Sequence, residues 1–358
     1  MKNISPMEGL RGFAVFLVFI VHYVTHVGPW LSRESHIFAF AQKLQSVGHA
    51  GVDLFFVLSG YLIYSSLISR HQTFFRFMSR RIQRIYPTFV VIFIGYIILS
   101  FAFPSKNKIP GTVVEGMIYL VQNFLLLPGI FPIMPMIDVA WSLSYEMLYY
   151  LIIPFIILIF RLRDRSPIWR VVFFLCLSVL ITLFSILIGG SPRIVMFIAG
   201  ILLYEAMRSD HAPRPQSATG LLALVVGLLA LVPYSNSPQL YVIQIAILFI
   251  AFFIFCLVCF QNSTAWLPRF FSFTPLRWLG NMSYSYYLLH GLVLNLLFLG
   301  LSSIVTPTTT YGHLLFFIFL LPMFCLTLIP TAILFLWVER PFSLALPNQK
   351  WNEPSGHL

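Results

Sequence analysis

The chain has 358 residues, of which 59% are hydrophobic and only 9% are charged. Ordinary globular domains carry about 25% charged residues, so this composition excludes a soluble globular domain and indicates an integral membrane protein. The formal net charge of +11 is first a signal for orientation in the membrane, and it does not imply a nucleic-acid partner.

Apolar blocks long enough to cross a hydrocarbon core of about 30 Å recur along the whole chain. They predict an all-α fold, a polytopic transmembrane helical bundle of about ten spans, and they lack the weak alternation of an outer-membrane barrel. The predicted spans cover residues 10–28, 50–69, 84–103, 140–160, 169–188, 193–207, 218–233, 239–260, 279–303 and 313–338.

The distribution of basic residues predicts the orientation of the bundle. With a cytoplasmic N-terminus, most of the 22 Lys and Arg residues lie on the cytoplasmic side, as the positive-inside rule requires. Both ends are then cytoplasmic, with residues 1–345 embedded in the membrane and residues 346–358 forming a short tail. We expect the apolar segment 113–127 to lie at the outer surface or to re-enter it, because a crossing would invert the basic loop after Arg161.

The first predicted span carries Arg11 and, eleven positions later, His22. On a helix these residues are about 16 Å apart along the axis and lie on roughly the same face. A charged residue near the bilayer centre costs roughly 2.5 to 3.5 kcal/mol, so ionisable residues within spans are candidates for function. We therefore take His22, with Arg11 at the cytoplasmic end of the same span, as candidate functional residues.

Asp53 lies just inside the second predicted span, at a depth similar to that of His22. A carboxylate bonded to one imidazole nitrogen would fix the tautomer and raise the basicity of the other nitrogen. The alternative is an interhelical hydrogen bond that only holds the bundle together. Gly51 and Gly60 in the same span should let neighbouring helices approach closely.

Three arginines, Arg80, Arg81 and Arg84, precede the third predicted span. If this segment is helical, they form one cationic face at the cytoplasmic surface. Guanidinium groups bind phosphates bidentately, so the cluster suits a polyanion with several phosphate groups. Anionic lipid headgroups are the alternative partners.

Polar residues also occur in three later spans. Trp141 is an interface anchor, and Glu146 lies about a turn and a half deeper in the same span. Tyr287 and His290 follow in the span from residue 279, where His290 is either a catalyst or a buried histidine satisfied by Tyr or Ser. Glu339, at the end of the last span, is expected to pair with Arg11 or with an arginine of the 80–84 face.

The four cysteines of the chain lie inside apolar blocks. Cys256 and Cys259 form a Cys-Leu-Val-Cys sequence, but buried thiols in such helices are more often small apolar fillers than a redox pair. We expect neither redox chemistry nor a metal site.

Together these pieces resemble the acyltransferase family 3 of membrane proteins over nearly the whole chain. The matching motifs are Arg11 with His22, Gly51-Val-Asp53-Leu-Phe-Phe-Val-Leu-Ser-Gly60, Arg81-x-x-Arg84-Ile-x-Pro87, Trp141-Ser-Leu-Ser-x-Glu146, Ser283-Tyr-x-x-Tyr287-Leu-x-His290 and Glu339-Arg-Pro341. Each motif is weak alone, whereas six in order are specific.

The resemblance implies an O-acyltransferase that moves an acyl group, usually acetyl, from cytoplasmic acyl-CoA to a carbohydrate hydroxyl. It associates Arg11 and His22 with catalysis. We expect a multi-pass protein of the cell (inner) membrane whose acceptor is a surface polysaccharide or its lipid-linked precursor. We also expect a stand-alone member, because the sequence ends without the SGNH-type domain that some members add.

These expectations assign roles to the candidate residues. His22, Arg11, Asp53 and Glu146 would be catalytic, and Arg80, Arg81 and Arg84 would bind the phosphates of acyl-CoA, while Trp141, Tyr287 and His290 would contact the substrate. His22 could act as a general base or take the acyl group itself. The rival hypotheses are a secondary transporter with an intramembrane proton relay and a scaffold without chemistry.

Overall fold

The computed structural model describes residues 5–104, 107–188, 190–209, 213, 215–233, 237–261, 263–304 and 312–344. Among these residues every regular element is helical, so the all-α prediction is confirmed. The predicted tail, residues 346–358, lies outside the described residues.

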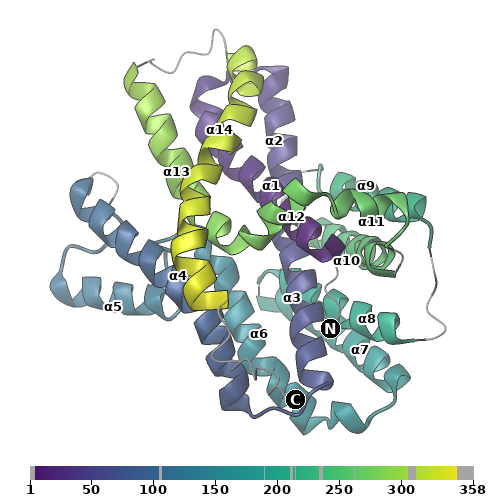
Figure 1. Ribbon diagram of the computed structural model, residues 1–358. Helices are drawn as coiled ribbons and strands as arrows, with labels where there is room; N and C mark the ends of the chain where they lie inside the picture. Colours follow the sequence, from purple (N-terminus) through teal and green to yellow (C-terminus); the bar gives the residue numbers. More distant parts are fainter. Residues whose placement is uncertain are drawn as a thin grey trace, which may run out of the picture.

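The chain forms long helices connected by short loops and shorter helices (Figure 1). The elements of the first half are α1 (Ser5–Val27), η1 (Gly28–Trp30), α2 (His36–Gly48), α3 (Ala50–Ile68), α4 (Phe74–Ala102), α5 (Val113–Phe124), α6 (Ala140–Ile159), η3 (Leu162–Asp164) and α7 (Pro167–Ile188). Those of the second half are η4 (Pro192–Ile194), α8 (Val195–Arg208), α9 (Ser217–Ala230), α10 (Pro238–Gln261), α11 (Trp266–Phe271), α12 (Thr274–Asn281), α13 (Ser283–Ile304), α14 (Gly312–Leu334) and the π-helix η5 (Phe335–Leu344).

The structure is a polytopic helical bundle. Within the described residues, eight helical segments are long and apolar enough to cross a membrane. The predicted spans 193–207 and 218–233 correspond to α8 and α9, which have 14 residues each and are therefore only about 21 Å long. Helix α5 has 12 residues, too few to cross the hydrocarbon core by itself.

Three segments differ from the hydropathy prediction. Helix α2 continues into α3 as one apolar run of 33 residues, although residues 36–48 were expected to be a loop. Helix α4 begins at Phe74, ten positions before the predicted span, because Thr73 caps it by accepting a hydrogen bond from the backbone N–H of Arg76. The predicted loop 261–278 contains α11 and most of α12.

Helix α1 is the central element of the bundle. It packs against α2, α3, α12 and α13, so segments from both ends of the sequence surround it (Figure 1). Helices α3 and α8 also pack closely, since a Cβ atom added at Gly60 would lie 2.1 Å from the carbonyl oxygen of Phe197. A Cβ atom at Gly51 would lie 2.5 Å from the carbonyl oxygen of Ala14 in α1. The predicted close approach at both glycines is confirmed.

Candidate active site

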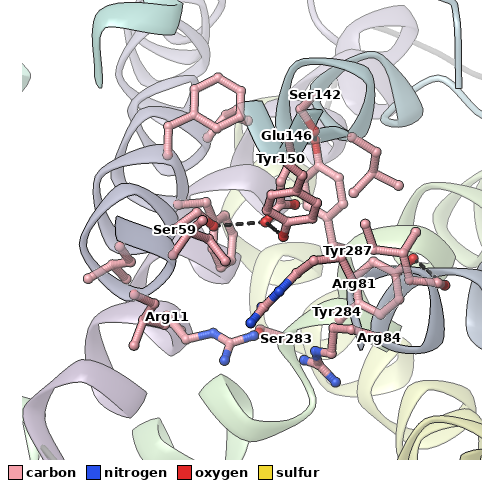
Figure 2. Close-up of a pocket in the computed structure, with 18 residues that line it drawn as sticks. Arg11, Ser59, Arg81, Arg84, Ser142, Glu146, Tyr150, Ser283, Tyr284 and Tyr287 are labelled. Atoms are coloured by element: carbon pink, nitrogen blue, oxygen red, sulfur yellow. Dashed lines mark hydrogen bonds between the residues drawn. The ribbon is translucent and has the colours of Figure 1, made fainter. Parts of the chain in front are cut away.

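A cavity of about 140 Å³ opens between α1, α3, α4, α6 and α13. We call it the arginine cavity, because the side chains of Arg11, Arg81 and Arg84 line it together with Glu146. Figure 2 shows the three arginines reaching the cavity from two helices, Arg11 from α1 and the other two from α4. The helical arrangement expected for Arg81 and Arg84 is therefore confirmed, and it brings them beside Arg11.

Glu146 forms the polar wall of the arginine cavity on α6. Its Oε1 atom accepts hydrogen bonds from Ser59 Oγ, at 2.9 Å, and from the hydroxyl of Tyr150 (Figure 2). The guanidinium group of Arg81 lies 5.7 Å from the centroid of the Tyr150 ring and 5.4 Å from that of Phe77. Arg81 therefore lies against aromatic faces, and its buried Nε atom has no hydrogen-bond partner among the described residues.

Arg84 is anchored by the last helix. Its Nη1 atom lies 2.7 Å from Oε1 of Glu339, which confirms the predicted pairing of Glu339 with the 80–84 face. The other carboxylate oxygen of Glu339 accepts hydrogen bonds from the backbone N–H of Ser285, at 3.0 Å, and from its hydroxyl, at 2.6 Å. Because Glu339 is fully buried, this network fixes η5 against α4 and α13.

Two further cavities adjoin the arginine cavity. A groove of about 1190 Å³ shares Arg11 and Arg84 with it and adds Arg340 of η5. A side cavity of about 340 Å³ shares Arg81 and adds Arg80 and Arg208. Arg80 thus faces the side cavity, so the predicted single cationic face is divided between two neighbouring cavities.

His22 lies in a different cavity. This histidine cavity has a volume of about 310 Å³ and is lined by His22 and His26 of α1, together with Lys108, Asp138 and Asn295. Lys108 and Asp138 form an ion pair at 2.5 Å, and Lys108 Nζ also donates to the backbone carbonyl of Pro135. The loops before α5 and before α6 are therefore joined at the mouth of this cavity.

His290 is the neighbour of His22 on α13. The two rings meet edge to face with centroids 4.8 Å apart, and His290 is fully buried. His290 Nδ1 lies 2.8 Å from the backbone carbonyl oxygen of Tyr286, so we assign the proton to Nδ1. Its Nε2 atom has no hydrogen-bond partner among the described residues.

Asp53 is held by a different partner from the one expected. Its Oδ2 atom lies 2.6 Å from Nη1 of Arg193, whose guanidinium group also bonds to the hydroxyl of Tyr241 at 2.8 Å. This contact ties α3 to η4 and α10. Trp141 packs edge-on against Tyr145 and is absent from the described linings of the arginine and histidine cavities.

Several side chains of the two cavities were not predicted from the sequence. Ser59, Ser142 and Tyr150 are neutral, so they cost little to insert into a membrane and their sequence does not identify them as candidates for function. Lys108 and Asp138 lie outside the predicted spans, where charged residues are common. The only sequence signal for Ser59 and Ser142 was their position inside two motifs of the family.

The described residues contain no group of three or more His, Cys, Asp or Glu side chains that could hold a metal ion. The arginine cavity presents guanidinium groups and the Glu146 carboxylate, and the histidine cavity presents two imidazoles, the Lys108 amine and the Asp138 carboxylate.

The fold and the cavities define a class of protein, a multi-pass helical membrane protein with polar cavities inside its bundle. Residues 5–336 match the model of a protein family described as "Acyltransferase domain". The chain belongs to this acyltransferase family, as its motifs indicated.

Curated relatives agree with this assignment. The chain is 24% identical over 327 residues to the peptidoglycan O-acetyltransferase OatA of Listeria monocytogenes, covering 82% of this chain and 50% of that protein. It is 26% identical over 331 residues to the O-acetyltransferase OatA of Staphylococcus aureus, covering 81% and 50%. It is 24% identical over 375 residues to the putative peptidoglycan O-acetyltransferase YrhL of Bacillus subtilis, covering 95% and 55%. The chain thus spans about half the length of these relatives, and no solved structure matches it significantly.

Proposed function

We propose that the protein is an O-acyltransferase of the cell membrane that moves an acyl group, acetyl in the simplest case, from acyl-CoA to a carbohydrate hydroxyl. The observation that carries the proposal is the placement of Arg11 and His22. They lie on one helix but line two different polar cavities, one with arginines and one with histidines. A phosphate-rich donor and a hydroxyl-bearing acceptor can then be held apart until transfer.

The donor is assigned to the arginine cavity and its two neighbours. Arg80, Arg81 and Arg84 of α4, with Arg11, provide guanidinium groups for the phosphates of coenzyme A. Arg81 lines both the side cavity and the arginine cavity, so a donor bound through its phosphates in the first can extend its thioester arm into the second. With the predicted orientation this side is cytoplasmic, where acyl-CoA is made.

The acceptor is assigned to the histidine cavity. Asp138, Asn295 and His26 offer hydrogen-bond partners for sugar hydroxyls, and the cavity opens at the end of α1 remote from Arg11. The names of the relatives include peptidoglycan, so a cell-envelope glycan or its lipid-linked precursor is the acceptor class that we propose. The proposed location is the cytoplasmic (inner) membrane.

His22 is the proposed general base. It takes the proton of the acceptor hydroxyl while the oxygen attacks the thioester carbonyl carbon, and the carbon–sulfur bond then breaks. The departing thiolate receives the proton from the imidazolium, so free coenzyme A and a carbohydrate ester are the products. His290 contacts His22 and is proposed to position its ring, while Glu146 holds the polar wall of the donor cavity.

The direct test uses the purified protein in proteoliposomes with radiolabelled acetyl-CoA. Addition of a soluble glycan fragment should cause release of free coenzyme A thiol and appearance of label in the glycan. Mass spectrometry of cell-envelope glycans with and without the gene should then show the loss of an acetyl increment. Uptake of labelled sugar without acyl-CoA, and no thiol release, would instead support the secondary transporter.

A further inference from the structure

The arginine cavity and the histidine cavity are separated by a hydrogen-bonded contact between α6 and α13. The hydroxyl groups of Ser142 and Tyr287 lie 2.6 Å apart. Tyr287 also donates to the backbone carbonyl oxygen of Val139 at 3.0 Å, and Ser142 Oγ lies 3.2 Å from the same oxygen. These three groups, which we call the latch, form hydrogen bonds with one another, and none of them is charged.

The latch residues and their neighbours in sequence line different cavities. Ser142 and Tyr287 line the arginine cavity, whereas Val139 and Leu288 line the histidine cavity. Val139 is one helical turn before Ser142, and Leu288 directly follows Tyr287, so the linings of the two cavities are adjacent at the start of α6 and in α13. Both latch side chains are buried, and the Tyr287 ring meets Phe55 edge to face at 6.0 Å.

The latch lies close to His22, because the Tyr287 and His290 ring centroids are 6.3 Å apart and His290 contacts His22. His290, which contacts His22, lies one turn after Tyr287 on α13. A thioester held in the arginine cavity is therefore screened from His22 by the Tyr287 hydroxyl and ring. Rotation of this one side chain breaks two hydrogen bonds and removes the screen.

We propose, on the basis of the function proposed above, that Tyr287 and Ser142 form a gate that keeps water of the histidine cavity away from the donor thioester. In the structure the hydrogen bonds of the latch are formed, and this is the closed state of the gate. Its opening joins the two cavities beside His22, and it limits thioester cleavage to the time when an acceptor hydroxyl is in place. Tyr287 and Ser142 are thus positioning residues that determine whether the acyl group goes to sugar or to water.

A weakened gate has a defined chemical consequence. When the gate opens without an acceptor, a water molecule attacks the thioester carbonyl carbon and the carbon–sulfur bond breaks. The acyl group leaves as the free carboxylic acid, and coenzyme A leaves as the thiol. The measurable quantity is the ratio of acceptor-independent thiol release to acceptor-dependent ester formation.

The test compares this ratio in the wild type and two variants. Tyr287→Phe removes the hydroxyl but keeps the ring against Phe55, and Ser142→Ala removes the other hydroxyl. The loss of one buried hydrogen bond shifts a two-state equilibrium about fivefold. Ser142→Ala removes one of the two hydrogen bonds that hold Tyr287 in place, so its ratio should rise about fivefold, whereas Tyr287→Phe removes both, so its ratio should rise about 25-fold. Tyr149→Phe is the matched control, because its buried hydroxyl bonds to Gly60 at 3.4 Å away from both cavities, and its ratio should equal that of the wild type.

The possible results test the gate and the proposed function separately. If the wild type forms ester but both variants keep its ratio, or lose transfer and hydrolysis in parallel, the gate is overturned and the function stands. If the wild type cleaves no thioester with or without acceptor, both proposals fail. A variant that does not fold, judged by its melting temperature, leaves the decision to the other latch variant. Where neither folds, the nearly isosteric change Ser142→Cys decides, because it replaces the hydroxyl by a weak hydrogen-bonding group and should raise the ratio.

Discussion

The imidazole rings of His22 and His290 meet edge to face at 4.8 Å, although 267 residues separate them in the chain. The backbone carbonyl of Tyr286 orients His290 from the other side. This pairing gives the chain one histidine that reaches a cavity and one that is fully enclosed behind it. The two residues should therefore respond differently to substitution.

We expect His22→Ala to lower acyl transfer by about a hundredfold to ten-thousandfold, the range for loss of a general base. His290→Ala should cause a smaller loss, because it acts through the orientation of His22. Initial rates with saturating acetyl-CoA and glycan fragment measure both effects, and equal expression and melting temperature are the control. Near-native turnover of His22→Ala would place the chemistry elsewhere, with His290 as the next candidate.

Arg81 is the clearest residue for testing donor binding. It lines the arginine cavity, contacts aromatic rings rather than a carboxylate, and has a buried Nε atom without a partner. Arg81→Ala should raise the KM for acetyl-CoA by about tenfold to a hundredfold, as expected for loss of a charge-assisted hydrogen bond to phosphate, with little change in the KM for the acceptor. The same substitution at Arg76, at the exposed start of α4, is the matched control.

Arg84 has a structural role that complicates the same experiment. Because Glu339 is fully buried, Arg84→Ala leaves a carboxylate without its cation, which costs about 3 kcal/mol in comparable buried pairs. We expect a marked fall in the melting temperature, partly restored in the double variant Arg84→Ala/Glu339→Gln. Additive losses in the double variant would show that the ion pair contributes little to stability.

The sequence was most informative where apolar length or burial of charge decides the structure. Eight long apolar segments became helices, and the cost of isolated charge correctly indicated that Glu339 needed an arginine. The same reasoning could not find α2, whose Gln42 and Lys43 interrupt the apolar pattern, or α11 and α12, which are too short to show a period.

The candidate site was predictable in part for a similar reason. Arg11, Arg81, Arg84 and Glu146 were marked by their charge, and the structure gathers them in one cavity. Asp53 was marked too, but its partner Arg193 could not be deduced because the pairing depends on how η4 packs beside α3. Neutral hydroxyls such as those of Ser142 and Tyr287 cost little to insert into a membrane, so their contact with each other becomes apparent only in three dimensions.

The ion pair of Asp53 and Arg193 leads to a prediction about stability and position. Asp53 is completely buried, Arg193 is partly buried with 14% of its side chain exposed, and Arg193 also bonds to the His49 carbonyl at 3.3 Å. We expect Asp53→Asn and Arg193→Met to lower the melting temperature by similar amounts. In the double variant, the losses of unfolding free energy should not add, and the coupling energy should be about 0.5 to 3 kcal/mol. A loss of turnover in Asp53→Asn that Arg193→Met does not share would instead support a catalytic role for the carboxylate.

The ion pair of Lys108 and Asp138 at the mouth of the histidine cavity tests where the acceptor binds. Asp138 is exposed at 70% of its side chain and directly precedes Val139, so a sugar hydroxyl can reach its carboxylate from solvent. Asp138→Asn and Lys108→Met should each raise the KM for the glycan fragment several-fold. Hydrogen bonds to a charged group contribute roughly 1.5 to 3 kcal/mol, but solvent screens this exposed pair and reduces the effect. The KM for acetyl-CoA and the acceptor-independent rate should stay constant, and Lys43→Met on the exposed face of α2 provides the control. If both variants instead change the KM for acetyl-CoA, the donor and not the acceptor enters through the histidine cavity.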